Sequence, residues 1–218
     1  MPEIVTVGEA LIDLTQTEED EKHIRRYAAF PGGAPANVAV AVARLGAGAA
    51  FIGKVGRDAF GASIRETLCR NGVDVTGLYE SERDLTTLAV VSVDAGGERS
   101  FAFYRTPGAD TQLTPEEAVR ALEAYEKRPM FLHFGSVSLT AEPARSATLA
   151  AARRAQELGI LLSYDPNYRP SLWSDEETAL VRMREPLPLC HVLKLAEEEL
   201  ELLTGTQDLE EGTQSLRE

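Results

Sequence analysis

Short apolar segments alternate with longer, alanine-rich segments along this chain, and no other feature constrains its fold as strongly. Residues 4–7 are rich in β-branched side chains, as in a strand that is buried on both faces of a sheet. Residues 34–45 predict a buried helix, and residues 49–52 return to the strand-like pattern. A strand, a helix and a second strand in this order form the repeating unit of a parallel sheet, so the sequence predicts an α/β fold.

The same alternation continues toward the end of the chain. Asp58 is a candidate N-cap for a helix that runs to about Arg70, where Asn71 and Gly72 form a stop signal. The later expected elements are helices at residues 115–126, 142–158 and 197–203, and strands at residues 130–134, 160–164 and 191–195. A chain of 218 residues, 44% of them hydrophobic, suits one buried core better than two.

Two neighbouring segments interrupt the alternation. Residues 87–93 and 98–104 are strand-like, and the Asp-Ala-Gly-Gly sequence between them is typical of a hairpin turn. With a weaker strand at residues 23–30, they predict a small antiparallel lid. This lid would span about residues 14–30 and 84–106 and project from the parallel sheet.

Charge and composition exclude several classes of function. The chain has 35 acidic residues against 22 Lys and Arg, and its formal charge of −13 would repel nucleic acid and anionic lipid. Acidic residues interrupt the apolar N-terminal segment at Glu3, Glu9 and Asp13, which argues against a signal peptide or a spanning helix. Cys69 and Cys190 form no C-x-x-C pair. We therefore expect a cytoplasmic protein without nucleic-acid or membrane partners and without a direct metal ligand.

A first group of candidate binding residues follows the first strand. Asp13 lies just beyond that strand, at the carboxyl edge of the predicted sheet, where open α/β sheets bind ligands. Gly32 and Gly33 would let a ligand contact bare backbone, and Asn37 lies one turn into the next helix. Together these groups could bind vicinal hydroxyls. Alternatively, the glycines make a tight turn, and Asp13 and Asn37 only satisfy loop backbone.

A second group of polar side chains follows the strand at residues 160–164. Arg169 could hold an anionic or hydroxyl-rich group with its planar guanidinium, while Asp165 or Asn167 orients it or contacts phosphate and water. Alternatively, an Asp–Arg pair only holds the loop in place.

The segment PGGAPANVAVAVARLGAGAAFIGKVGRDAFG resembles the first signature of the ribokinase-like (PfkB) carbohydrate kinase family. FAFYRTPGAD, FLHFGSVSL, SYDPNYRPSLW and LKLAEEELELLTG resemble later blocks of its fructokinases, so the likeness covers essentially all 218 residues. It implies that residues 1–218 are the N-terminal part of one ribokinase-like domain. The implied activity is transfer of the ATP γ-phosphate to a ketose, foremost D-fructose, to give fructose 6-phosphate.

By this resemblance Asp13, Gly33 and Asn37 take sugar-binding positions, and Phe103 and Arg105 of the lid face the substrate. Without the family match, Phe103 would be read as lid core and Arg105 as a solvated surface charge. Adding Gly32 and Arg169, the expected sugar-binding residues are Asp13, Gly32, Gly33, Asn37, Phe103, Arg105 and Arg169. The lid would close over the sugar and could pair with the lid of a second copy to form a homodimer.

The family also implies a site for ATP and Mg²⁺. Its N-x-x-E motif has a Glu that helps to hold the magnesium–phosphate assembly through water; this chain keeps Glu199 but has Ala196 at the Asn position. Lys194 is expected to face the nucleotide phosphates. The expected phosphate and metal environment therefore comprises Asp165, Asn167, Lys194 and Glu199, without a direct metal ligand. The other glutamates of this segment are expected to form a solvated acidic helix face.

The family places its general base, an Asp, in a later G-A-G-D segment, and no such segment occurs among the 218 residues. We therefore expect no catalytic residue here, expect the base and the ATP-binding segment beyond Glu218, and expect the chain as given to be inactive. Two alternatives remain open. One is a 2-keto-3-deoxygluconate kinase, whose carboxylated substrate Arg105 and residues 165–173 would suit, and the other is a non-catalytic sugar-binding or dimerisation module.

Overall fold

A parallel sheet forms the centre of the molecule in the computed structural model, which describes residues 1–93 and 99–217. Within those residues the sheet has seven strands in the order β11-β10-β9-β1-β4-β5, with β6 also paired to β4, and every pair is parallel. The strands are β1 (Ile4–Val7), β4 (Ala49–Gly56), β5 (Val73–Asp74), β6 (Leu78–Ser81), β9 (Phe131–Gly135), β10 (Leu161–Asp165) and β11 (Val192–Leu193). The predicted α/β class is confirmed.

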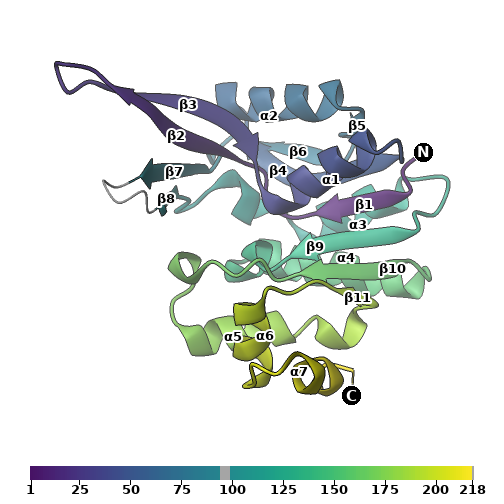
Figure 1. The fold of residues 1–218 in the computed structure, drawn as a ribbon. Helices are drawn as coiled ribbons and strands as arrows, with labels where there is room; N and C mark the ends of the chain where they lie inside the picture. Colours follow the sequence, from purple (N-terminus) through teal and green to yellow (C-terminus); the bar gives the residue numbers. More distant parts are fainter. Residues whose placement is uncertain (94–98, 218) are drawn as a thin grey trace.

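Helices cover both faces of this sheet (Figure 1). The α-helices are α1 (Ala34–Arg44), α2 (Ala59–Arg70), α3 (Pro115–Glu123), α4 (Ala144–Glu157), α5 (Glu176–Arg184), α6 (Glu197–Thr204) and α7 (Leu209–Ser215). The described residues also form short 3-10 helices: η1 (Ala109–Gln112), η2 (Val137–Thr140), η3 (Pro170–Leu172) and η4 (Leu187–Leu189). No helix in the described part of the chain has both the length and the apolar character needed to cross a bilayer.

The first part of β4, residues 49–53, is apolar at every position because both faces of the sheet are covered. Ala50 and Ile52 are fully buried against α3 and α4, whereas Phe51 is fully buried on the other face against α1 and α2. Because successive side chains of a strand point to opposite faces, a strand covered on both sides needs apolar residues at every position. The resulting two core layers fix the sheet between its helices.

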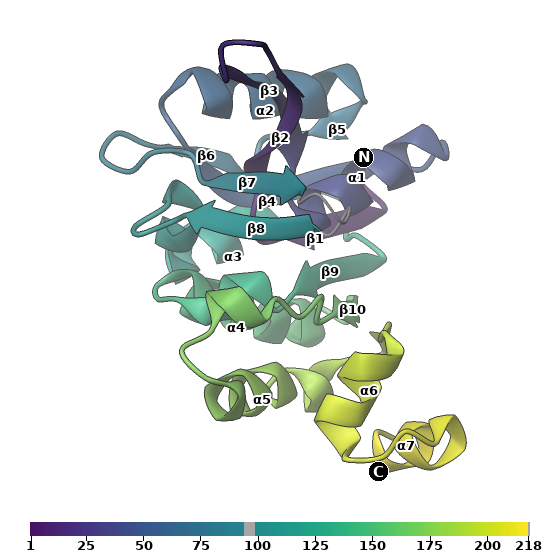
Figure 2. The same ribbon diagram turned by 60° about the vertical axis from the view of Figure 1, so that its left-hand side comes forward.

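A second sheet, which we call the lid sheet, lies beyond the carboxyl ends of the parallel strands (Figures 1 and 2). Its order is β3-β2-β7-β8, with β2 (Leu11–Glu19), β3 (Arg25–Gly32), β7 (Leu88–Val93) and β8 (Arg99–Tyr104). The predicted small lid is present, and its β2–β3 and β7–β8 pairs are antiparallel as expected, but β2 pairs with β7 in parallel, so the lid sheet is mixed. Both of these strands leave the core in the same direction. The predicted hairpin turn at residues 94–97 lies outside the described residues.

Several elements were not predicted from the sequence. The helix α5 begins at an N-cap, Asp175, whose carboxylate accepts the Thr178 N–H at 2.6 Å, but only Ala179 and Met183 of this helix are buried. Such a narrow apolar face gives little periodic signal. The strands β5 and β6 are short, and β11 covers only two residues of the expected strand at 191–195.

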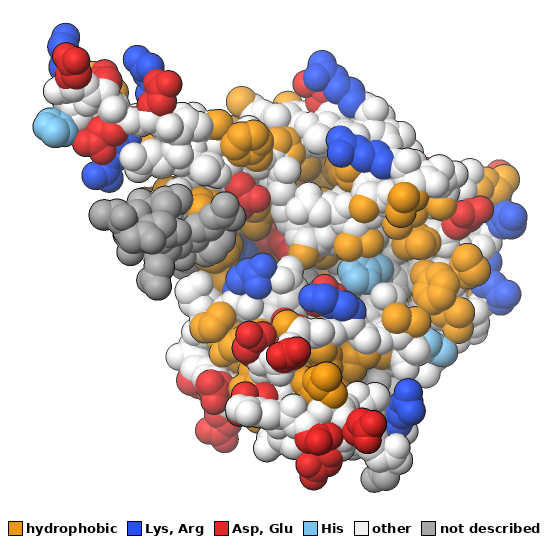
Figure 3. All heavy atoms as spheres, viewed as in Figure 1, with side chains coloured by type: hydrophobic (Ala, Val, Ile, Leu, Met, Phe, Trp, Pro, Cys, Tyr) orange, Lys and Arg blue, Asp and Glu red, His pale blue; other side chains and the backbone are white. Residues whose placement is uncertain are grey.

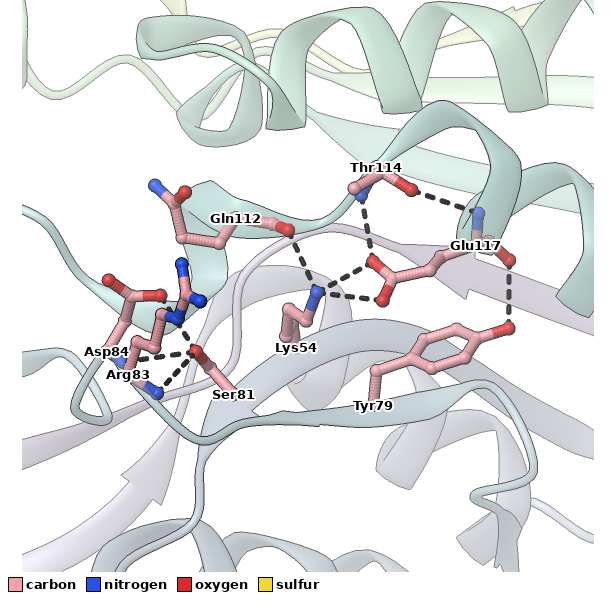
Figure 4. A network of polar contacts seen from close by, with 8 residues as sticks. All are labelled: Lys54, Tyr79, Ser81, Arg83, Asp84, Gln112, Thr114 and Glu117. Carbon is pink, nitrogen blue, oxygen red and sulfur yellow. Dashed lines mark hydrogen bonds and ion pairs between the residues drawn. The ribbon is translucent and has the colours of Figure 1, made fainter.

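A partly buried polar network joins β4 to the start of α3 (Figure 4). Lys54 Nζ lies 2.7 Å from Glu117 Oε1 and donates to the Gln112 carbonyl at 3.1 Å. Glu117 also closes a capping box with Thr114, and its carbonyl accepts the Tyr79 hydroxyl. These contacts hold η1, which contains Asp110, at the end of the sheet where the lid begins.

Candidate functional site

A cavity of about 180 Å³ lies between the ends of the parallel strands and the lid sheet. Its lining comes from six separate parts of the chain: the β1–β2 junction with β2, the start of α1, β8, η2, the loop after β10, and η3. Of the expected sugar-binding residues, it brings together Asp13, Gly33, Asn37, Phe103 and Arg169. Asn167 from the expected phosphate group lines the same cavity. The further lining residues are Glu9, Leu11, Ala34, Val137 and Leu172.

Asp13 on β2 provides a half-buried carboxylate in this cavity. Burial raises the pKa of Asp13 above its ordinary value, and the positive charge of Arg169 acts in the opposite direction. Gly32 does not line the cavity but makes room for this carboxylate, since a Cβ atom there would collide with Asp13 Oδ2. Asp13 can therefore accept hydrogen bonds from hydroxyl groups of a ligand.

The start of α1 contributes backbone as well as a side chain. Gly33 is the N-cap, with φ 103° and ψ 127°, a conformation that favours glycine. A Cβ atom on Gly33 would come within 2.5 Å of the Glu9 carbonyl oxygen. The Asn37 N–H donates to the Gly33 carbonyl at 2.9 Å, which places the Asn37 side chain one turn into the helix and at the cavity.

Glu9 is a lining residue that the sequence reasoning did not select. Its side chain is buried, Oε1 accepts the Ala34 N–H at 2.9 Å, and Oε2 is buried without a hydrogen-bond partner. Burial raises the pKa of Glu9 to about 7. A sequence signal did exist, because Glu9 follows β1 even more closely than Asp13 does.

Arg105 lies behind the cavity rather than in its lining. Its Nε donates to Asp110 Oδ2 at 2.7 Å, and its terminal nitrogens donate to Thr140 Oγ1 at 2.7 Å and to the Val137 carbonyl at 3.1 Å. The Arg105 side chain is 6% exposed, so its reading as a solvated surface charge is wrong. Its contacts instead hold η2, whose Val137 lines the cavity.

The residues expected near phosphate lie at the end of β10 and in the loop after it, just after β11, and in the first turn of α6. Asp165 Oδ2 lies 3.3 Å from Lys194 Nζ, and Asp165 Oδ1 accepts the Asn167 N–H at 3.1 Å. Arg169 donates to the Tyr168 carbonyl instead of pairing with Asp165, so the loop is not held by an Asp–Arg pair.

Glu199 is buried, in contrast to its exposed neighbours Glu197, Glu198 and Glu201, which form the expected solvated face. The two Glu199 oxygens accept the N–H groups of Tyr168 at 2.7 Å and Ala196 at 2.8 Å. Figure 3 shows acidic side chains gathered on the surface at the end of the molecule where α6 and α7 lie. Among residues 1–93 and 99–217, no group of three or more His, Cys, Asp or Glu side chains could hold a metal ion.

Comparison with known proteins extends this picture. Among curated relatives, Fructokinase-1 of Oryza sativa subsp. japonica is 46% identical over 210 residues, which make up 95% of this chain and 64% of that protein. The fructokinase of Salmonella typhimurium is 41% identical and covers 97% of this chain and 66% of its own length. The chain thus spans 64% of the length of the rice relative.

Solved structures give the same result at the level of the fold. The crystal structure of fructokinase from Xylella fastidiosa matches with a TM-score of 0.88 and 36% identity, over 100% of this chain and 67% of that one. A fructokinase double mutant from Vibrio cholerae O395, in its fructose, ADP and potassium ion bound form, matches with a TM-score of 0.85 and 39% identity over the same shares. The expected ribokinase-like fold is confirmed.

The family model described as pfkB family carbohydrate kinase matches residues 1–218, the full length of the chain. This match and the cavity at the sheet edge agree with the motifs found in the sequence. The chain belongs to the pfkB family of carbohydrate kinases.

Proposed function

We propose that this chain is the sugar-binding part of an ATP-dependent fructokinase, which transfers the γ-phosphate of ATP to the 6-hydroxyl of D-fructose. The observation that carries this proposal is the convergence of Asp13, Gly33 and Asn37 on one cavity at the carboxyl edge of the sheet. A carboxylate, a bare peptide and an amide together supply acceptors and donors for neighbouring hydroxyls. The relatives named fructokinase support the choice of sugar.

The charges around the cavity favour a neutral ketose over a carboxylated one. Among the described lining residues, the Asp13 carboxylate faces one guanidinium, that of Arg169, and Glu9 is a second acidic residue beside them. The second candidate cation, Arg105, is already paired with Asp110 in a buried position. A substrate carboxylate would therefore meet at least as much negative as positive charge, which speaks against 2-keto-3-deoxygluconate as the preferred substrate.

ATP and Mg²⁺ are the proposed co-substrate and cofactor of the reaction. Lys194 is 63% exposed beside Asp165 and could reach a phosphate group, whereas Glu199 would act through the loop that its two oxygens hold. Bound Mg²⁺ would neutralise charge on the phosphates. Because the 218 residues contain no G-A-G-D segment, we propose that the chain as given binds sugar without phosphorylating it.

We further propose a cytoplasmic location and a homodimer formed through the lid sheet. Large apolar side chains are exposed on its strands and their connection: Ile24, Tyr27, Phe30 and Tyr104 are between 42% and 68% exposed. A second copy would remove such surface from water. Analytical ultracentrifugation tests the homodimer, and a monomer at micromolar concentration would contradict it. The alternative to an enzyme is a non-catalytic module that only binds sugar or dimerises.

Calorimetric titration tests the proposed function. The chain should bind D-fructose saturably, should bind 2-keto-3-deoxygluconate more weakly, and should show little affinity for a non-hydrolysable ATP analogue. Tighter binding of 2-keto-3-deoxygluconate would favour the alternative kinase. A longer form of the protein that binds fructose but does not consume ATP would favour the binding module.

A further inference from the structure

The buried carboxyl of Glu9 is not explained by packing alone. The residue is 3% exposed, and only one of its two side-chain oxygens has a hydrogen-bond partner. Burying an acid with an unpaired oxygen is unfavourable, and natural proteins keep such groups mainly where function requires them. An apolar residue of similar size would fill this space without that penalty.

The position of Glu9 links it to the start of α1 by two contacts. Its Oε1 accepts the N–H of Ala34, the first residue of the helix, at 2.9 Å. Its own carbonyl oxygen lies under Gly33, at 2.5 Å from the place where a Cβ atom would stand. Glu9 therefore supports the Gly33–Ala34 peptide from the side of the sheet, and that peptide lines the cavity.

Two backbone N–H groups act on the Glu9 carboxyl, its own and that of Ala34, and the Ala34 N–H is the one that connects it to the helix start. Arg105 and Asp110 are the charged residues that act on it, with opposite signs, and Arg105 donates its hydrogen bonds to Asp110, Thr140 and the Val137 carbonyl. Asp13 and Arg169 line the same cavity. The first N–H groups of any helix lack partners within the helix, and Glu9 Oε1 supplies an acceptor for one of them, that of Ala34.

We propose that Glu9 is a positioning residue for the sugar site: through the Ala34 N–H it holds the Gly33–Ala34 turn in the place where a bound ketose meets its backbone. This role rests on the proposed function. Glu9 acts through the turn and not by direct contact, because Oε2 is buried and Oε1 already accepts the Ala34 N–H.

Two variants and a control test the role. Glu9→Leu removes the acceptor with little change of volume, whereas Glu9→Gln keeps a carbonyl oxygen for the Ala34 N–H. Fructose affinity measured by calorimetry should fall about tenfold in the first variant and stay within about threefold of the wild type in the second, as loss of one hydrogen bond to a buried acid implies. A role in packing alone would leave the fructose affinity of both variants close to that of the wild type, because leucine and glutamine both fill the space of Glu9.

The control is Asp58→Ala, which removes the N-cap of α2. Asp58 accepts the N–H groups of Gly61 and Thr86, both at 2.8 Å, and it does not line the cavity. This variant should unfold at lower temperature with unchanged fructose affinity. If Glu9→Leu binds fructose as tightly as the wild type, or if Glu9→Gln weakens binding as much as Glu9→Leu does, the proposal is wrong.

Amide hydrogen exchange without sugar separates this proposal from the proposed function. In Glu9→Leu the Ala34 amide should exchange at least about tenfold faster than in Glu9→Gln, and equal rates would overturn the positioning role. A wild-type chain that binds no fructose would overturn the proposed function, while the exchange rates would still show whether Glu9 holds the turn. If Glu9→Leu does not fold, Glu9→Gln and the wild type are compared with Glu9→Met, which also lacks the acceptor.

Discussion

Arg105 and Asp110 form an ion pair that is almost completely removed from solvent, with Nε and Oδ2 2.7 Å apart and side chains 6% and 1% exposed. The pair joins the end of the lid sheet to η1, and Arg105 extends it to η2 through Thr140 and Val137. Thr87 also donates to Asp110. The lid is therefore attached to the core by a buried polar network as well as by its strands.

Replacing Arg105 by Met should destabilise the protein by about 3–5 kcal/mol, because Asp110 would remain buried without its partner. The matched control is Arg26→Met, which breaks the pair between Arg26 and Glu18. That pair is also 2.7 Å long, but its side chains are 63% and 64% exposed, and its loss should change stability by less than about 1 kcal/mol. Urea unfolding measures both, and equal losses would contradict the assignment of Arg105 to the core.

Glu9 should make stability depend on pH. Its pKa is about 7 in the folded protein against an ordinary 4.5, because burial disfavours the charged form. Between these values the folded state holds the extra proton, so stability should fall as pH rises from about 4.5 to 7 and then stay at its lower level.

Glu9→Gln removes this titration and provides the comparison. The free energy of unfolding of the wild type should fall relative to that of the variant by about 1.4 kcal/mol per pH unit in this window. From pH 5 to pH 8 the difference should therefore change by up to about 3 kcal/mol in favour of the variant. Other titrating groups are common to both proteins and cancel in the difference. A stability difference that is independent of pH over this range would show that Glu9 is not a buried acid of raised pKa.

Gly33→Ala tests the backbone of the site. Gly33 has φ 103°, and a Cβ atom there would meet the Glu9 carbonyl oxygen at 2.5 Å. Gly46 is the matched control, since its φ is 92° but nothing lies within 4 Å of its Cβ position. Gly46→Ala should lower the free energy of unfolding by about 1 kcal/mol, and Gly33→Ala should lower it by at least about 2 kcal/mol more. Gly33→Ala should also abolish fructose binding. Similar losses in the two variants would mean that the close approach at Gly33 has no consequence.

Lys194→Ala should leave sugar binding intact. The Lys194 side chain is 63% exposed and pairs with Asp165, so its loss should change stability by less than about 1 kcal/mol. Because Lys194 does not line the cavity, fructose affinity in calorimetry should stay within about twofold of the wild type. A loss of fructose affinity of tenfold or more would place Lys194 in the sugar site instead of the phosphate environment.

The sequence located much of the cavity because its residues follow from local rules. Asp13 and Arg169 come just after buried strands, and the carboxyl ends of parallel strands meet at one edge of the sheet. Gly33 and Asn37 are placed by the start of a strongly apolar helix. These positions need no knowledge of distant contacts.

The remaining features depend on tertiary contacts that leave no local pattern. Arg105 is buried because Asp110 and Thr140 come to it from other parts of the fold. The side chain of Glu9 is buried by the packing of α1 over the β1–β2 junction. Acidic residues are usually exposed, so the residue type alone gives no sign of this burial. The parallel pairing of β2 with β7 likewise depends on where both strands leave the core.

A crystal structure of the chain with D-fructose tests the central claim most directly. The account predicts the sugar in the cavity beneath the lid sheet, with at least one hydroxyl within hydrogen-bond distance of the Asp13 carboxylate and others near the Gly33 backbone and the Asn37 side chain. Fructose bound elsewhere on the molecule, or in this cavity without contact to Asp13, would contradict it.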